Sequence, residues 1–189
     1  MSDRVLVAGV GNVLRRDDGF GVAVAARLSG EGGLPPEVDL IETGIGGLGI
    51  VQQLMEGYRA LIVVDAVDRG AEPGTIFVLE PEIPDPADMP IEAWRERFSN
   101  LHLAEPARVF LLARALGVLP ERVVLVGCQP QDAAELGEGL SPPVQAAVPL
   151  AARRVRQLVE ELSAISYQSS LRRRTWRLCN VRPENVAQS

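Results

Sequence analysis

The residues best suited to chemistry in this sequence are three aspartates and a histidine. Asp17 and Asp18 follow a glycine-flanked turn near the start of the chain. Asp65 closes an apolar run, and His102 is the one histidine. Two carboxylates brought close together repel each other unless a proton or a cation neutralises them. Carboxylates with an imidazole form a ligand set for a divalent transition metal such as nickel or zinc. These residue types therefore suggest a cation site, provided that the fold brings them together.

Each of these residues also has a purely structural interpretation. Asp17 or Asp18 can cap a helix or lie in its positively polarised first turn. Asp65 can be a turn residue that follows a strand, and a single loop histidine is more often a surface residue than a ligand. Both interpretations fit the residues, because no feature of the sequence brings His102 to the aspartates.

Alternating strand and helix patterns surround these residues. Short apolar runs predict buried strands, and helical spacing or helix-start signals predict helices. The expected strands are residues 4–10, 37–43, 60–67, 75–79 and 122–128. The expected helices are residues 18–29, 47–57, 103–117 and 142–162. Strands that alternate with helices predict a three-layer α/β/α sandwich with a largely parallel, buried sheet.

Such a fold offers the aspartates a common place. Open α/β sheets bind ligands at the carboxyl ends of their strands, where the strand order reverses. The loop with Asp17 and Asp18 follows the first predicted strand, and Asp65 lies at the end of the third. If these two strands are neighbours, their carboxylates meet at one edge of the sheet.

Composition and motifs argue against several other classes of protein. The 189 residues are 47% hydrophobic, which suits one folded domain. No apolar stretch reaches the roughly 18 residues of a membrane span and no secretory signal opens the chain, so a cytoplasmic protein is expected. All 19 basic residues are arginine, and without lysine no Walker motif exists. The start of a dinucleotide fingerprint at residues 9–14 lacks its third glycine, and there is no G-x-S-x-G elbow.

Charge divides the chain into two parts. Residues 164–189 carry a net charge of +4, which leaves −10 on residues 1–163. An acidic body argues against nucleic acid as a partner. We expect a folded domain over residues 1–163 and a basic, poorly ordered C-terminal extension over residues 164–189. Trp176 is the one residue of the extension that argues against this, since a buried tryptophan anchors a segment strongly.

The run GVGNVLRRDDGFG, residues 9–21, resembles the signature G-x-G-N-x-L-x-x-D-[DE]-G-x-G of the hydrogenase maturation proteases along its whole length. Weaker matches follow in the same order, namely VVDAV at 63–67, a histidine opening a helix at 102, and LVGCQP with GLSPPV at 125–144. The family consists of endopeptidases that trim the C-terminus of [NiFe]-hydrogenase large subunits. The resemblance runs from about Val5 to Leu162 and leaves the basic extension without a counterpart.

The resemblance implies a fold, a reaction and a site. The implied sheet is mixed and five-stranded, of order 2-1-3-5-4, with the fourth strand antiparallel. The implied reaction removes the C-terminal extension of a nickel-loaded large-subunit precursor by hydrolysis of one peptide bond. The family's metal-binding residues fall on Asp18, Asp65 and His102, which would complete the coordination of the precursor's own nickel. No separate catalytic nucleophile is visible, so these three residues, acting through the substrate metal, are the catalytic candidates.

Gly44, Gly46 and Gly47 follow the second predicted strand and could let a substrate backbone come close, because glycine has no side-chain bulk. A flexible strand–helix turn explains them equally well.

The rival function is a non-enzymatic α/β module that binds a metal or a nucleotide.

Overall fold

Five strands form a single sheet in the computed structural model, which describes residues 3–44, 47–90, 92 and 106–178, with side-chain surroundings as far as Ser163. The predicted strands are confirmed to within one residue at each end. The strands are β1 (Val5–Val10), β2 (Val38–Gly44), β3 (Ala60–Ala66), β4 (Ile76–Leu79) and β5 (Arg122–Cys128).

The strand order is β2-β1-β3-β5-β4, as the resemblance implies. β1 pairs in parallel with both β2 and β3, so that Val7 lies between Leu40 and Ile62. β3 pairs in parallel with β5, whereas β4 is antiparallel to β5. The ends of β1 and β3 therefore lie side by side at the carboxyl edge of the sheet.

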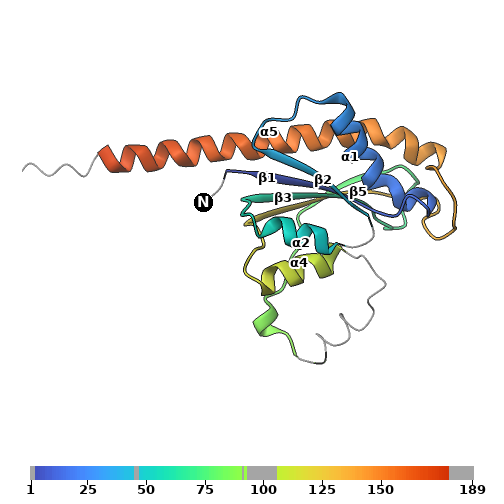
Figure 1. Cartoon of the computed structure of the whole chain (residues 1–189), viewed down its shortest axis with the longest axis horizontal. Helices are drawn as coiled ribbons and strands as arrows, with labels where there is room; N and C mark the ends of the chain where they lie inside the picture. Colours follow the sequence, from blue (N-terminus) through green and yellow to red (C-terminus); the bar gives the residue numbers. More distant parts are fainter. Residues whose placement is uncertain (1–2, 45–46, 91, 93–105, 179–189) are drawn as a thin grey trace, which may run out of the picture.

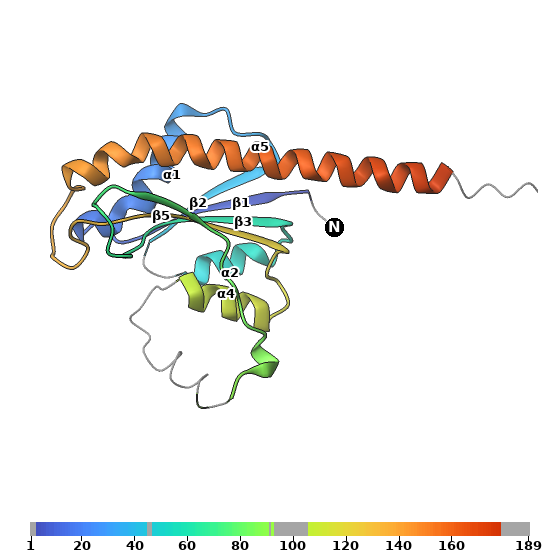
Figure 2. The ribbon, with the colours of Figure 1, turned by 180° about the vertical axis from the view of Figure 1, so that it is seen from behind.

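Helices cover both faces of the sheet, which confirms the three-layer sandwich. In Figures 1 and 2, α1 and α5 lie on one face and α2 and α4 on the other. Two short 3-10 helices, η1 and η2, lie in the loops after β1 and β4. The helices are η1 (Arg16–Gly19), α1 (Phe20–Glu31), α2 (Leu48–Leu54), η2 (Pro86–Asp88), α4 (Pro106–Ala115) and α5 (Pro142–Leu178).

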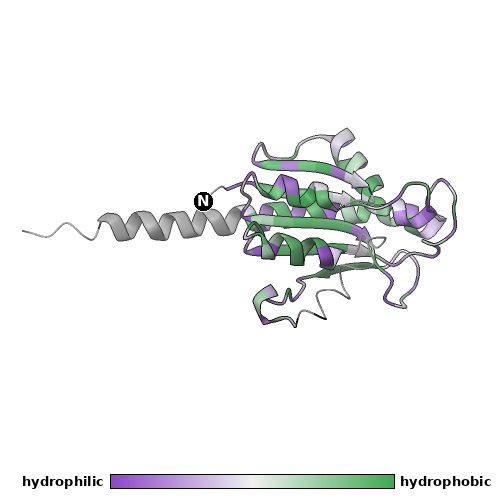
Figure 3. Ribbon diagram, turned by 60° about the horizontal axis from the view of Figure 1, so that its bottom comes forward, coloured by the Kyte–Doolittle hydropathy of each residue, from purple (hydrophilic) through white to green (hydrophobic). Residues whose placement is uncertain are grey.

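The apolar runs of the strands are explained by two hydrophobic cores, one on each face. Along β1, Val5 and Val7 join the core under α1 and α5, whereas Leu6 and Ala8 join the core under α2 and α4. β3 and β5 alternate in the same way. Since both faces of the sheet are covered, successive residues are apolar, and the strands are hydrophobic along most of their length (Figure 3).

Helix α5 is longer than the sequence pattern predicts. It continues to Leu178 rather than ending at Leu162, and it extends away from the sheet (Figure 1). Leu162 is the last residue of α5 in the described hydrophobic core. No helix in the described part of the chain is long and apolar enough to cross a membrane.

Removal of residues 164–189 is expected to leave the fold intact, because α5 extends away from the sheet toward Leu178 (Figure 1). The melting temperature of the truncated protein should lie within about 3 °C of the full chain, which corresponds to roughly 1 kcal/mol. Thermal unfolding followed by circular dichroism measures this. A fall of ten degrees or more would show that the extension is structural.

Candidate metal and substrate site

The glycines of the run at residues 9–21 let the backbone after β1 fold back onto the sheet. Gly11 has φ 137°, and a Cβ there would collide with the carbonyl oxygen of Asp18. A Cβ at Gly21 would collide with backbone atoms of Val10 and Val64. Only glycine permits these approaches, which hold η1 and the start of α1 against the ends of β1 and β3. The spacing of the motif therefore places Asp18 at the carboxyl edge of the sheet.

Asp18 is a half-buried residue of η1 whose carboxylate faces back toward the end of β1. Its Oδ2 accepts a hydrogen bond from the backbone N–H of Asn12 at 2.9 Å. Burial raises the pKa of Asp18, while the Asn12 hydrogen bond and the charge of Arg15 act in the opposite direction. Neither η1 nor α1 has a side-chain cap, so Asp18 is not a helix cap.

Asp65 lies near the end of β3 and is almost fully buried, with 6% of its surface exposed. Its Oδ1 accepts the backbone N–H of Ala66 at 2.8 Å, and no described residue donates to its Oδ2. Burial and the negative charge of Asp18 raise the pKa of Asp65 to about 8. The structure thus brings Asp18 and Asp65 together at the edge where the strand order predicts a ligand site.

The donor set of this pair fits a divalent cation. Two carboxylates at one edge of the sheet repel each other when both are charged, and a cation bound between them removes this repulsion. Carboxylate oxygens are ligands for divalent metals, and a nitrogen ligand would complete the set that nickel or zinc prefers. The nitrogen predicted for this role belongs to His102, which lies outside the described residues.

Asp17 has a different role from that of its neighbour Asp18. It is fully buried, with 0% of its surface exposed. Its carboxylate accepts backbone N–H groups of Gln131 at 2.8 Å, Asp132 at 3.0 Å and Ser141 at 2.6 Å, and also the Ser141 hydroxyl at 2.8 Å. Burial alone would raise the pKa of Asp17, but these hydrogen bonds lower it below its usual value. Asp17 therefore fastens the loop before α5 to η1.

Gln129 is a buried polar residue whose role the sequence reasoning missed. Its Oε1 accepts the backbone N–H groups of Arg69 at 2.8 Å and Ala71 at 3.2 Å. Its Nε2 donates to Asp68 Oδ1 at 2.9 Å. Gln129 thereby orders the turn that follows Asp65. The available signal was an uncharged polar residue directly after the apolar run of β5, inside LVGCQP.

Cys128 does not provide a nucleophile. The side chain is fully buried, and burial together with the charge of Asp17 raises the pKa of its thiol to about 12. The reactive form of cysteine is the thiolate, which is scarce at neutral pH when the pKa is so high.

The three glycines at and after the end of β2 do not share one environment. Gly44 has φ 53° with open space around its Cα, and its carbonyl accepts the N–H of Gly11 at 3.3 Å. Gly44 therefore lies beside the end of β1, and its role as a substrate contact stays a prediction. A Cβ at Gly47 would collide with the side chain of Val109, so packing of α2 on α4 already requires this glycine. Gly46 lies outside the described residues.

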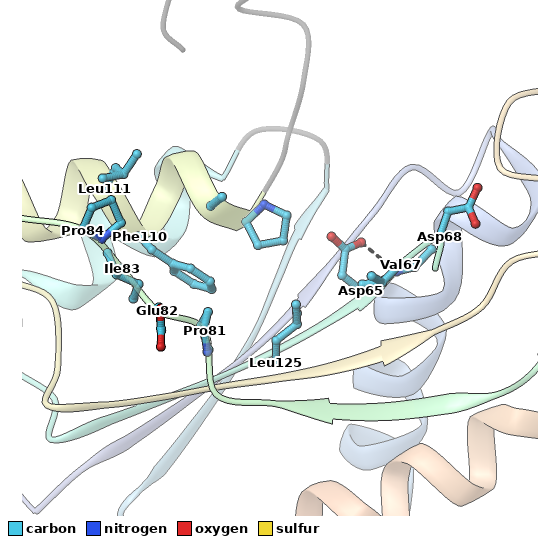
Figure 4. A pocket seen from close by; sticks show the side chains of 13 residues that line it. Asp65, Val67, Asp68, Pro81, Glu82, Ile83, Pro84, Phe110, Leu111 and Leu125 are labelled. Atoms are coloured by element: carbon cyan, nitrogen blue, oxygen red, sulfur yellow. Dashed lines mark hydrogen bonds between the residues drawn. The ribbon is translucent and has the colours of Figure 1, made fainter. Parts of the chain in front are cut away.

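A cavity of about 440 Å³ opens beside Asp65 (Figure 4). It lies between the end of β3, the loop after β4 and the first half of α4. The side chains of Phe110 and Leu125 line it together with those of Pro81 and Ile83. Asp65 therefore borders a space that can receive part of another molecule.

Comparison with known proteins identifies the family. The sequence model of the HycI family, described as hydrogenase maturation protease, matches residues 22–158. The chain belongs to the hydrogenase maturation protease family. It is therefore a peptide hydrolase, a hydrogenase maturation endopeptidase that processes the large-subunit precursor, and not a non-enzymatic binding module.

Relatives of this maturation protease support the assignment along most of the chain. The hydrogenase expression/formation protein HupD of Rhodobacter capsulatus is 38% identical over 162 residues, which cover 86% of this chain and 72% of HupD. The hydrogenase maturating endopeptidase HybD from Escherichia coli has a similar structure, with a TM-score of 0.66 and 30% identity. The match covers 84% of this chain and 93% of HybD. The hydrogenase 2 maturation peptidase from Thaumarchaeota archaeon SCGC_AB-539-E09 has a TM-score of 0.62 and 32% identity, and the match covers 84% of this chain and 99% of the peptidase.

The raised pKa of Asp65 makes the stability of the metal-free protease depend on pH. Between about pH 4 and pH 8, folded Asp65 keeps a proton that the unfolded chain has lost, so the free energy of unfolding falls as the pH rises. In chelator-treated protein, Asp65→Asn should therefore have a higher free energy of unfolding than wild type. This advantage should be larger at about pH 8 than at about pH 5, by about 2–4 kcal/mol. Thermal unfolding at both pH values measures this.

The exposed Asp88 provides a control for that experiment. Asp88→Asn should change stability equally at both pH values. If the advantage of Asp65→Asn were the same at both pH values, Asp65 would be ionised in the folded metal-free protein.

Proposed function

We propose that Asp18, Asp65 and His102 bind the nickel ion carried by a [NiFe]-hydrogenase large-subunit precursor, and that the chain then removes the precursor's C-terminal extension. The observation that carries this proposal is the carboxylate pair at the carboxyl edge of the sheet, in which Asp65 is buried and Asp18 is half-buried. The charge of Asp18 helps to raise the pKa of Asp65 to about 8, and a bound cation relieves this repulsion. Nickel belongs to the substrate in this scheme, so a precursor without it meets a pair that holds a proton in place of the cation.

The place where α4 begins supports a contribution from His102. Pro106, the first residue of α4, lines the same cavity as Asp65. His102 precedes Pro106 by four residues. An extended chain covers at most about 3.5 Å per residue, so four residues span no more than roughly 14 Å. This short sequence separation from a cavity-lining residue is what supports His102 as the third ligand.

The residues of the chain have separate tasks in the proposed reaction. Asp65 is protonated at neutral pH in the metal-free protein and releases this proton when the precursor's nickel arrives. Asp18 keeps its oxygen oriented through the N–H of Asn12. Hydrolysis adds one water molecule across the peptide bond, and the inert thiol of Cys128 takes no part in it. Gly44, with open space beside its backbone, admits the extended precursor chain at the same edge.

Incubation with two forms of the extended precursor tests the proposed function. One form carries nickel and the other is nickel-free, and mass spectrometry records the loss of the C-terminal peptide. Cleavage of the loaded form alone is the expected result. Equal cleavage of both forms would overturn the role of nickel as the recognition mark, and failure to cleave the loaded form would overturn the proposed substrate.

A further inference from the structure

The cavity beside Asp65 has a wall chemistry that indicates what it binds. Apolar side chains form most of the surface, with Phe110 and Ile83 next to each other and Leu125 on the side nearer Asp65 (Figure 4). The charged residues among the described lining are all acidic, namely Asp65, Asp68 and Glu82. An acidic group entering the cavity would meet no positive charge among the described lining, whereas an apolar group would be removed from water against apolar walls.

The cavity is held open by fixed contacts. Phe110 is 2% exposed and packs in the core under α2 and α4, so its ring cannot turn into the space without leaving that core. A guanidinium N–H of Arg114 donates to the carbonyl of Ile83, which ties the loop after β4 to α4. On the opposite side, Gln129 holds Asp68 in place. The space is therefore preformed, as is usual for ligand pockets of this size.

We propose that this cavity binds an apolar side chain of the precursor, from a residue that adjoins the scissile peptide bond. The inference rests on the proposed function, because Asp65 is both a wall of the cavity and a proposed nickel ligand. A precursor whose nickel contacts Asp65 presents the neighbouring part of its chain to the cavity mouth. The carboxylates thus recognise the loaded metal, and the cavity selects the sequence beside it.

Ala107 and Ala115 provide a matched pair of variants. Both are exposed alanines on α4, but only Ala107 lines the cavity. Ala107→Phe partly fills the space and should lower kcat/KM for the nickel-loaded precursor about 10- to 100-fold. Ala115→Phe should stay within about twofold of wild type. Thermal unfolding of both variants shows whether the fold is retained.

A second experiment changes the precursor and leaves the protease untouched, so it does not depend on the folding of any variant. Each of the residues flanking the cut is replaced in turn by Glu and by Gly in the nickel-loaded precursor. At one position, Glu should reduce kcat/KM for the wild-type protease at least about tenfold. Gly at this same position should lessen the difference between wild type and Ala107→Phe, because a smaller group no longer needs the filled space.

The outcomes separate the cavity from the nickel site. Equal cleavage by wild type and Ala107→Phe, or equal cleavage of all Glu-substituted precursors, would overturn the cavity proposal while strict nickel dependence persists. If instead nickel dependence were absent but the Ala107→Phe defect remained, the proposed metal site would fail and the cavity would stand as a substrate pocket.

Discussion

Asp18→Asn is expected to reduce cleavage of the nickel-loaded precursor at least about 100-fold, since loss of even an outer-shell partner of a metal ligand costs 10- to 100-fold. Asparagine keeps the size of the side chain and can still accept the Asn12 N–H, but it removes the negative charge. The free energy of unfolding should be unchanged or higher, because the charge that acts on Asp65 is gone. Mass spectrometry of the precursor and thermal unfolding of the variant measure the two effects.

His102→Ala should give the same combination of lost cleavage and intact fold. Loss of a helix cap cannot explain lost cleavage in Asp18→Asn, because asparagine caps helices as well as aspartate does and Asp18 caps none. Wild-type cleavage by Asp18→Asn would leave its carboxylate with no part in metal recognition, and the proposed mechanism would have to be abandoned.

Much of the fold could be predicted from local pattern. The three central strands are apolar runs whose residues alternate between two covered faces, so β1, β3 and β5 stand out without knowledge of their neighbours. The strand order, by contrast, followed from the resemblance at residues 9–21. Local pattern does not encode which strands pair, because parallel strands make their contacts over long sequence separations.

The different roles of Asp17 and Asp18 could not be predicted from the sequence. The two residues are adjacent and chemically identical, and both fit a helix cap or a metal ligand. What distinguishes them is the loop before α5: Ser141 and the N–H groups of Gln131 and Asp132 surround Asp17 from more than a hundred residues away. The length of α5 also escaped prediction, since the apolar helical pattern ends near Leu162 whereas the helix continues to Leu178.

Asp17→Asn is expected to destabilise the protein while leaving the chemistry of the site in place. The buried carboxylate accepts hydrogen bonds from three backbone N–H groups and one hydroxyl. Asparagine offers one oxygen and turns an NH₂ group toward donors, so at least one backbone N–H is left unsatisfied. The free energy of unfolding should fall by about 3 kcal/mol or more, since hydrogen bonds to charged groups contribute roughly 1.5–3 kcal/mol each. For a chain of this length, this lowers the melting temperature by about 6–12 °C.

The pH dependence of Asp17→Asn distinguishes a charge effect from a general packing defect. The folded-state pKa of Asp17 is lowered, so its stabilisation is present above the unfolded pKa and is lost as the pH falls through the folded pKa. The deficit of the variant should therefore be full at neutral pH and shrink in acid. Well below its melting temperature, the variant should still require nickel in the precursor, as wild type is expected to do. A variant as stable as wild type at neutral pH would show that the loop before α5 does not depend on this carboxylate, whereas loss of cleavage in a fully folded variant would give Asp17 a direct part in the reaction.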